Sequence, residues 1–462
     1  MPNIVIVHTD DTGRYIGPYG HDIDTPNLAG LADEGVLFRR AYCAGPTCSP
    51  SRSAVMTGQS PHANGMLGLA HRGFDLDDPD RHLATYLSER GVETVLAGQQ
   101  HEVSRDGMDR HEAARDLLGY DRTLEGDASA VEGRDIDGND ATPRDLANAA
   151  AAADFLRERD ADAGAPLFLS VGLYNTHQPM PLDQETVDPD RVRPPAPLPD
   201  VAPVREEMAA YHVLAGYVDD CVGTVIEGLA DGGHLDETLV VFTTDHGIPF
   251  PYMKCDLRDD GIGVSLIARF PDDERYRAGE TEDAMVSTMD LYPTFCEFLD
   301  LPVPAWTEGP SLLPLATGEA DSVRERVFSE VTYHAAYEPK RCVRTDRYKY
   351  IRRFDESYTR EVGPNTDDGP SKRSLVERGF LERRRPREAL YDLYHDPNER
   401  DDLAGDPAHA DVRAALADRL EAWMERTDDP LLDGPVPKPE GAVADRRDGV
   451  DPGGEYEPAD AR

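Results

Sequence analysis

Acidic and imidazole side chains follow two apolar, strand-like runs of the sequence. The run NIVIVHT leads into Asp10 and Asp11, and the run TLVVFTT leads into Asp245 and His246. Taken singly, each is also an ordinary solvated turn, because Asp and Gly are common turn residues. Brought together, the carboxylates would repel one another strongly unless a cation neutralised them. Oxygen ligands of this kind suit a hard divalent ion, Ca²⁺ or Mg²⁺.

The segment CSPSRSAVMTG, residues 48–58, places a cysteine at the expected start of a helix. Ser49 or Ser51 fits the capping position, and the Ala, Val and Met that follow suit a helix. A helix N-terminus favours anions, because unpaired backbone N–H groups point outward there. Cys48 is therefore either a structural cysteine or part of a reactive group, depending on the residues that the fold brings to it.

Apolar runs alternate with helical patterns up to about residue 325. The expected strands are 3–9, 92–98, 165–174, 238–245 and 263–270, and the expected helices include 25–35, 144–158 and 205–231. This alternation predicts an α/β fold with a large, mostly parallel sheet sandwiched by helices. Ligands bind at the carboxyl ends of the strands in such sheets. We therefore expect His101, His177 and the two acidic pairs at one edge of the sheet.

The character of the sequence changes near residue 325. We predict a large α/β domain over residues 1–325 and a smaller α+β domain, an antiparallel sheet plus a helix, over 326–427. Residues 428–462 are rich in Pro, Gly and acids and poor in apolar side chains, which predicts a disordered tail. A mobile surface loop is expected at 120–142.

The charge balance is strongly acidic, with a formal net charge of −42. Such a surface repels nucleic acids and anionic membranes, so neither is an expected partner. The chain has only five lysines, and an acid-rich, lysine-poor composition is typical of halophilic proteins. With no leader before the first strand and no apolar run long enough for a membrane span, we expect a cytoplasmic protein. The six cysteines form no CxxC pair and are expected to be free thiols.

The chain resembles the sulfatase family of the alkaline phosphatase superfamily over about residues 3–425. The matching stretches, in the family's order, are VHTDDTGRYIGPYG, TPNLAGLADEGVLFRRAYC, CSPSR, GQQH, LYNTHQP, TTDHGIPFPYMKCDLRDDGIGVSLIARFP and LYDLYHDPNERDDLA. CxPSR is highly specific in this context. GQSPHANGMLGL and DHGIPFP are most similar to the heparan N-sulfatase (sulfamidase) branch. The resemblance implies an alkaline phosphatase-like fold and a metal-dependent sulfatase that hydrolyses a sulfate ester or a sulfamate, preferably on a sugar.

The resemblance also implies that a maturation enzyme converts Cys48 to formylglycine, whose hydrate carries two hydroxyls on one carbon. One hydroxyl attacks the sulfur, and the other then loses a proton, expels sulfate and regenerates the aldehyde. Arg52 is expected beside this group. The implied ligands of one divalent cation, expected to be Ca²⁺ with Mg²⁺ as the alternative, are Asp10, Asp11, Asp245 and His246. The family often has Asn where His246 stands, and imidazole suits softer metals than Ca²⁺.

Three further residues match the family's catalytic positions. His101 is expected to take the proton that triggers sulfate release, and His177 to bind sulfate or help protonate the leaving atom. Lys254, which is the only lysine before residue 340, suits contact with a sulfate oxygen and the leaving group. His62 and Asn64 are expected at the rim of the substrate pocket.

Gln99 departs from the family pattern, which commonly has lysine two residues before the first catalytic histidine. We expect Gln99 to contact the substrate as a neutral hydrogen-bond donor, with Arg14 or Arg72 as candidate replacement cations. Because this charge is missing, one alternative remains: the protein is an inactive relative that binds sulfated sugars without hydrolysing them. The alternative enzyme is a phosphodiesterase or phosphonate monoester hydrolase of the same superfamily, because phosphorus and sulfur transfer share in-line geometry and oxyanion stabilisation.

Overall fold

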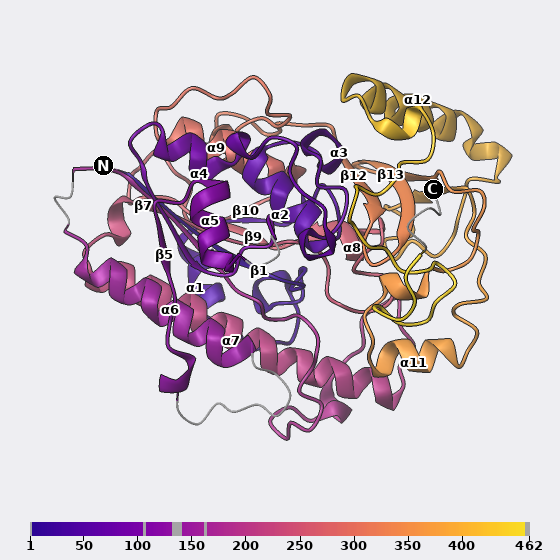
Figure 1. The fold of residues 1–462 in the computed structure, drawn as a ribbon, viewed down its shortest axis with the longest axis horizontal. Coiled ribbons are helices and arrows are strands. Elements are labelled where there is room, and N and C mark those ends of the chain that lie inside the picture. The colour runs from indigo at the N-terminus through magenta and orange to yellow at the C-terminus, as the bar shows by residue number, and fades with distance from the viewer. Residues whose placement is uncertain (1, 105–107, 132–140, 161–163, 458–462) are drawn as a thin grey trace.

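The computed structural model describes residues 2–104, 108–131, 141–160 and 164–457. Its centre is an eight-stranded sheet (Figure 1). The strands lie in the order β10 (Glu280–Glu282), β2 (Val36–Phe38), β9 (Leu266–Arg269), β7 (Thr238–Thr244), β1 (Asn3–Thr9), β6 (Leu167–Gly172), β4 (Glu93–Gly98) and β5 (Arg122–Leu124). Strand β9 is antiparallel to β7 and β2, and the other neighbours are parallel. The predicted large, mostly parallel sheet is confirmed.

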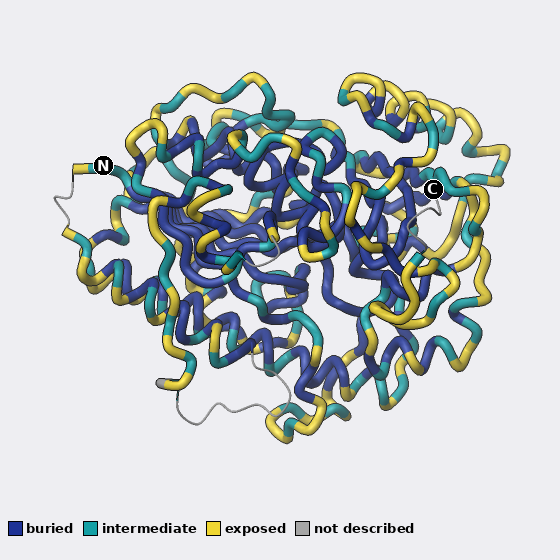
Figure 2. The backbone as a smooth tube through the Cα atoms, in the orientation of Figure 1, coloured by how far each residue is buried: buried dark blue, intermediate teal, exposed yellow. Residues whose placement is uncertain are grey.

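Helices cover both faces of the sheet, and the central strands β7, β1, β6 and β4 are almost wholly buried (Figures 1 and 2). Successive residues of β1 alternate between the faces, with Ile4 and Ile6 in one apolar core and Val5 and Val7 in the other. Because both faces are apolar, the strand reads as a continuous hydrophobic run. One face carries α1 (Pro26–Glu34), α6 (Ala141–Glu158) and α7 (Ala202–Asp231), and the other carries α2 (Cys48–Thr57), α4 (Leu83–Ser88), α5 (Arg110–Leu118) and α9 (Leu291–Phe298).

The carboxyl ends of four neighbouring parallel strands, β7, β1, β6 and β4, meet at one edge of the sheet. The register pairs Thr9 with Thr244, and His8 with Gly172. A Cβ atom on Gly172 would lie 1.8 Å from the carbonyl oxygen of Gln99. Glycine therefore allows the segment after β4 to approach β6, so that the residues following all four strands share one region.

A separate antiparallel sheet follows in the chain. It has the order β12 (Arg326–Tyr333), β13 (Tyr337–Thr345), β14 (Tyr348–Arg353) and β15 (Glu388–Asp392), and α12 (Ala410–Arg426) packs against it. Val331 and Tyr333 of β12 belong to the same apolar core as α2. The remaining elements are a small sheet of β11 (Val286–Ser287), β3 (Ala41–Tyr42) and β8 (Gly263–Val264), and helices α3 (Pro61–Asn64), α8 (Asp259–Ile262), α10 (Leu313–Ala316) and α11 (Pro370–Val376).

The C-terminal segment differs from the disordered tail predicted for 428–462, because several residues between 429 and 445 are buried against the protein; residues 458–462 lie outside the described residues. Val436 and Ala444 are buried, and Asp445 accepts two hydrogen bonds from Arg72, at 3.1 and 3.2 Å. A few well-spaced small apolar residues and buried ion pairs anchor this segment, and average composition does not detect such anchors. The segment 120–142, predicted as a loop, contributes β5 to the sheet, and its residues 132–140 lie outside the described residues.

All six cysteines are free and buried, as their spacing predicted. Among the described residues, none of the helices has both the length and the apolar character needed to cross a membrane.

Candidate active site

Two strand ends bring the predicted acidic pairs together. The backbone N–H of Asp11, just after β1, donates to Asp245 Oδ1 at 2.8 Å, and that of Thr12 donates to Thr244 Oγ1 at 3.0 Å. Gly247 then lets the chain turn tightly, because a Cβ atom there would lie 2.0 Å from the carbonyl oxygen of Asp260. The two motifs, although 234 residues apart in the sequence, form one buried cluster.

The chemistry of this cluster fits a cation. One ligand atom each from Asp11, Cys48, Asp245 and His246 lies within 4.8 Å of all the others. His246 donates its Nδ1–H to the carbonyl oxygen of Gly247 at 2.9 Å, which leaves a lone pair on Nε2. That lone pair faces Asp11 Oδ1 at 3.2 Å and Asp245 Oδ2 at 3.4 Å. Neither oxygen accepts a hydrogen bond from any residue that the structure describes, and a cation between these atoms would stabilise the arrangement.

The pKa values follow from burial of this cluster. Burial raises the pKa of Asp11 to about 7, and lowers the pKa of His246 to about 4. Burial also raises the pKa of Asp10, with Arg52 opposing the rise and Asp245 adding to it. A metal site requires ionised carboxylates. The protein groups alone do not keep all of these carboxylates ionised.

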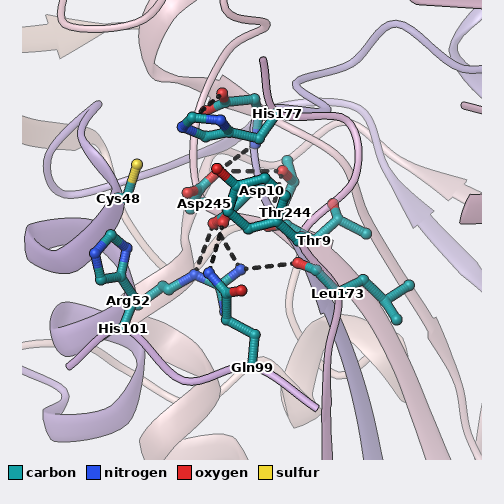
Figure 3. Close-up of polar contacts among 12 residues, drawn as sticks. Thr9, Asp10, Cys48, Arg52, Gln99, His101, Leu173, His177, Thr244 and Asp245 are labelled. Atoms are coloured by element: carbon teal, nitrogen blue, oxygen red, sulfur yellow. Dashed lines mark hydrogen bonds and ion pairs between the residues drawn. The ribbon is translucent and has the colours of Figure 1, made fainter. Parts of the chain in front are cut away.

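Asp10 is held by two residues that the sequence placed in the site. Arg52 donates from Nε at 2.9 Å and from Nη2 at 2.7 Å to Asp10 Oδ1. Gln99 donates from Nε2 to Asp10 Oδ2 at 3.2 Å, so its amide supports a predicted metal ligand (Figure 3). Arg14 and Arg72 do not replace the missing lysine: Arg14 donates to the carbonyl oxygen of Ala41 at 2.6 Å, and Arg72 binds the C-terminal segment.

Cys48 lies at the start of α2, as predicted, but the capping residue is Thr47, and Ser49 and Ser51 lie within the helix, every residue of which is buried. Ser51 Oγ donates to the carbonyl oxygen of Asp245 at 2.5 Å, which docks the first turn of α2 onto the end of β7. The Cys48 sulfur lies 3.5 Å from His246 Nε2 and is placed with the acidic residues at the strand ends (Figure 3). Burial raises the pKa of the Cys48 thiol well above its ordinary value, so an unmodified Cys48 is a poor thiolate nucleophile.

Lys254 and His177 form the opposite wall of the cluster. His177 donates its Nδ1–H to the carbonyl oxygen of Gln178 at 2.6 Å, so Nε2 is free to accept a hydrogen bond from Lys254 at 3.1 Å. The Lys254 ammonium also lies 3.0 Å from Asp11 Oδ2 and 2.9 Å from Asp367 Oδ2. One ammonium therefore links a predicted metal ligand, a predicted catalytic histidine and a carboxylate from the second part of the chain.

His101 forms a pair with another imidazole, that of His71. Its Nε2 is 2.9 Å from His71 Nδ1, and the two rings stack with centroids 5.1 Å apart. Burial lowers the pKa of His101 to about 3, so the ring is neutral at pH 7. Its Nδ1 atom is buried and has no hydrogen-bond partner among the described residues.

His62 and Asn64, expected at the pocket rim, are placed elsewhere. His62 Nδ1 lies 2.8 Å from Glu330 Oε1 on β12, and the Asn64 amide donates to Ser53 and Thr57 of α2. Both side chains are buried, because the second sheet covers α3. Their polar groups join parts of the protein to one another and do not line the acidic cluster.

Three residues near the site were not identified from the sequence. Asp145 on α6 accepts hydrogen bonds from the backbone of Tyr174, at 2.9 Å from Oδ2, and of Asn175, at 2.8 Å, and thereby fixes the segment that carries His177. Asp145 could have been identified from the sequence, because an acidic residue on the buried face of an Ala-rich helix needs a polar partner. His71 and Asp367 carried no such signal, because both lie in turn-like segments whose partners are distant in the sequence.

The large sheet with helices on both faces is an alkaline phosphatase-like fold. The chain belongs to the sulfatase family: the family model described as Sulfatase matches residues 2–301, and the model described as N-sulphoglucosamine sulphohydrolase, C-terminal matches residues 251–377.

Individual relatives agree with this assignment. The chain is 29% identical to N-sulphoglucosamine sulphohydrolase of Homo sapiens over 94% of this chain and 92% of that protein. Among solved structures, a 2-O GAG sulfatase is similar with a TM-score of 0.70 at 22% identity, covering 95% of this chain and 96% of that one. The phosphonate monoester hydrolase of Agrobacterium radiobacter gives a TM-score of 0.69 at 22% identity, covering 96% and 100%. The two structures show a shared fold.

Proposed function

We propose that the protein hydrolyses a sulfate ester or a sulfamate on a sugar, using a formylglycine formed from Cys48 and one divalent cation. The reaction would add water across the S–O or S–N bond and release sulfate with an alcohol or an amine. The observation that carries the proposal is the position of Cys48, at the buried start of α2 and within 4.8 Å of ligand atoms from Asp11, Asp245 and His246. The name of the human relative supports a sulfated amino sugar as the substrate class.

Asp11, Asp245 and His246 would hold the cation, with Asp10 beside them, and Ca²⁺ is the ion that the oxygen-rich set favours. When present, the cation would supply positive charge for the sulfate oxygens, and the hydrated formylglycine would supply the attacking hydroxyl. Arg52 keeps Asp10 oriented through its two hydrogen bonds. A formylglycine-generating maturation enzyme is the implied partner.

The remaining residues handle protons. Lys254 donates to His177 Nε2, and this pair would supply a proton to the leaving oxygen or nitrogen. His101 would take the proton that triggers sulfate release; burial lowers its pKa to about 3, so the ring is neutral at pH 7 and has an unprotonated nitrogen.

The test is peptide mass spectrometry of residue 48, together with hydrolysis of 4-nitrophenyl sulfate and N-sulfoglucosamine. Protein made with a maturation enzyme should carry the aldehyde and hydrolyse at least one substrate. Cys48→Ala should abolish turnover, whereas Cys296→Ala, at another buried cysteine, should retain it. Turnover by a protein with an unmodified thiol at position 48 would overturn the mechanism.

His246 favours a second candidate, a phosphodiesterase or phosphonate monoester hydrolase, because its imidazole lone pair suits a softer metal than Ca²⁺. Side-by-side measurement of kcat/KM for 4-nitrophenyl sulfate and a nitrophenyl phosphodiester separates the two. A higher value for the phosphodiester, with Mn²⁺ exceeding Ca²⁺, would favour the second candidate.

A further inference from the structure

The second sheet carries a pocket that the hydrolytic site does not use. Its volume is about 310 Å³, and it lies between β13, β14 and the segments 355–362 and 385–387. We call it the arginine pocket. Its principal lining residues are Tyr337, Arg353, Tyr358, Arg360, Arg385 and Arg387. Its size is within the roughly 300–1,000 Å³ usual for small-molecule sites.

The charge of this pocket contrasts with that of the whole chain. The protein has a net charge of −42, yet the lining has four arginines against three acids, Glu338, Asp355 and Glu356. Lys340 and Arg258 lie behind the lining, where burial lowers the pKa of Lys340 to about 8. Although burial would raise the pKa of Asp256, Arg258 and Lys340 hold it well below its ordinary range. An excess of cations in an acidic protein favours binding of an anion.

Part of this positive charge has unused hydrogen-bonding capacity. Arg353 donates from Nη1 to the carbonyl oxygen of Pro386 at 3.0 Å, but its Nε is buried and has no partner among the described residues. Arg385 is held by Glu338 and Glu361, and Arg387 pairs with Glu356 at 2.7 Å. Arg353, which lines the pocket, and Arg360, which is exposed at its rim, have no carboxylate partner within ion-pair distance among the described residues.

We propose that the arginine pocket binds the oxyanion group of a sulfated or carboxylated sugar residue, at a site separate from the Cys48 centre. A guanidinium presents N–H groups in a planar fork that matches the oxygens of sulfate or carboxylate. Tyr337, Tyr358 and Pro339 supply apolar walls against which a sugar ring packs. The arginines therefore select ligands that carry an anionic group, and the apolar walls select those in which this group is attached to a ring.

The pocket and the active site share one connecting segment. Glu338 in the pocket accepts a hydrogen bond from the Asn365 amide at 3.0 Å, and Asp367, which contacts Lys254, follows two residues later. A sugar chain held in the arginine pocket would thus lie next to the segment that completes the active site.

The test is isothermal titration of the full chain carrying Cys48→Ala, which prevents turnover, with glucosamine 6-sulfate. Adding Arg353→Gln and Arg360→Gln should remove one binding event or weaken it at least tenfold. Arg352→Gln is the matched control, because Arg352 is the neighbouring residue on β14 and reaches toward Glu421 of α12. Arg360→Gln alone, at an exposed position, should weaken the same event without affecting folding.

Three outcomes would overturn the proposal. The first is that the isotherms with and without the arginine substitutions superimpose. The second is that glucosamine, which lacks the sulfate group, binds the pocket as tightly as its 6-sulfate, which removes the role of the anion. The third is that inorganic sulfate binds with the same affinity as the sulfated sugar, which removes the role of the apolar walls. None of these readouts uses hydrolysis, so failure here and failure of the proposed reaction are distinguishable.

Discussion

Asp367→Asn tests how the second part of the chain takes part in the reaction. Asp367 Oδ2 lies 2.9 Å from the Lys254 ammonium, and the two side chains are 13% and 2% exposed. The substitution keeps the shape and removes the charge, so Lys254 loses one of its ionised partners while its contacts with Asp11 and His177 remain. We expect the ammonium to lose its fixed position over His177 Nε2.

The size of the effect follows from this contact. A hydrogen bond to a charged group contributes about 1.5–3 kcal/mol. If it is lost in the transition state, kcat falls about 10- to 150-fold, since about 1.4 kcal/mol corresponds to a factor of ten. KM should stay level or fall, because the variant removes a negative charge that an anionic substrate would face.

The assay is steady-state hydrolysis of 4-nitrophenyl sulfate by protein whose conversion at residue 48 has been measured. Asp368→Asn is the matched control, because Asp368 is the next residue and pairs with Arg373 at 2.6 Å, away from Lys254. An equal loss of kcat in both variants, or a raised KM with unchanged kcat for Asp367→Asn, would refute the positioning role.

Three further predictions concern other parts of the molecule. Removing divalent cations with a chelator should abolish hydrolysis and lower the midpoint of thermal unfolding, and Ca²⁺ should restore both; an unchanged midpoint would count against a cation between Asp11 and Asp245. Arg72→Ala removes the partner of Asp445, so limited proteolysis should cleave the segment 440–457 faster than in the native chain, and equal cleavage rates would contradict the anchoring. Burial lowers the pKa of His62, but Glu330 outweighs this and raises it overall, so the stabilisation is complete below the unfolded pKa of about 6.5 and is lost as pH rises through the higher folded value. Thermal unfolding across pH 5–9 should show this loss, and His62→Gln should flatten it; an identical pH profile in the variant would exclude the His62–Glu330 pair as its source.

The fold was accessible from the sequence because its strands are buried on both faces. Residues 4–7 of the strand over 3–9 are all apolar because helices pack on each side, so the strand and the acidic residues that follow it can be read directly. The same logic placed Asp245 at the same edge. The hydrogen bond from Asp11 N–H to Asp245 then shows how closely two such ends approach.

Other contacts could not be predicted from the sequence, because they depend on which parts of the folded chain pack against one another. His62 lies in a polar segment that would suit a pocket rim, yet β12 covers it and pairs it with Glu330. Asp367 lies in the turn-like sequence GPNTDDGP, and only the three-dimensional arrangement brings it to Lys254. The prediction of a disordered tail was wrong for the same reason. A single pair such as Arg72 with Asp445 anchors a segment whose composition resembles a disordered tail.

The charges of the active site explain why one divalent cation and one sulfate suit it together. Four carboxylates contact one another or the two buried cations of the cluster: Asp10, Asp11, Asp245 and Asp367 face Arg52 and Lys254. With all of them ionised, the protein groups carry two surplus negative charges, which one divalent cation cancels. Sulfate would then enter a site whose net charge is close to zero. With a lysine in place of Gln99, the net charge of the site would be positive. Gln99 therefore weakens attraction for an anion while keeping Asp10 in place through its amide.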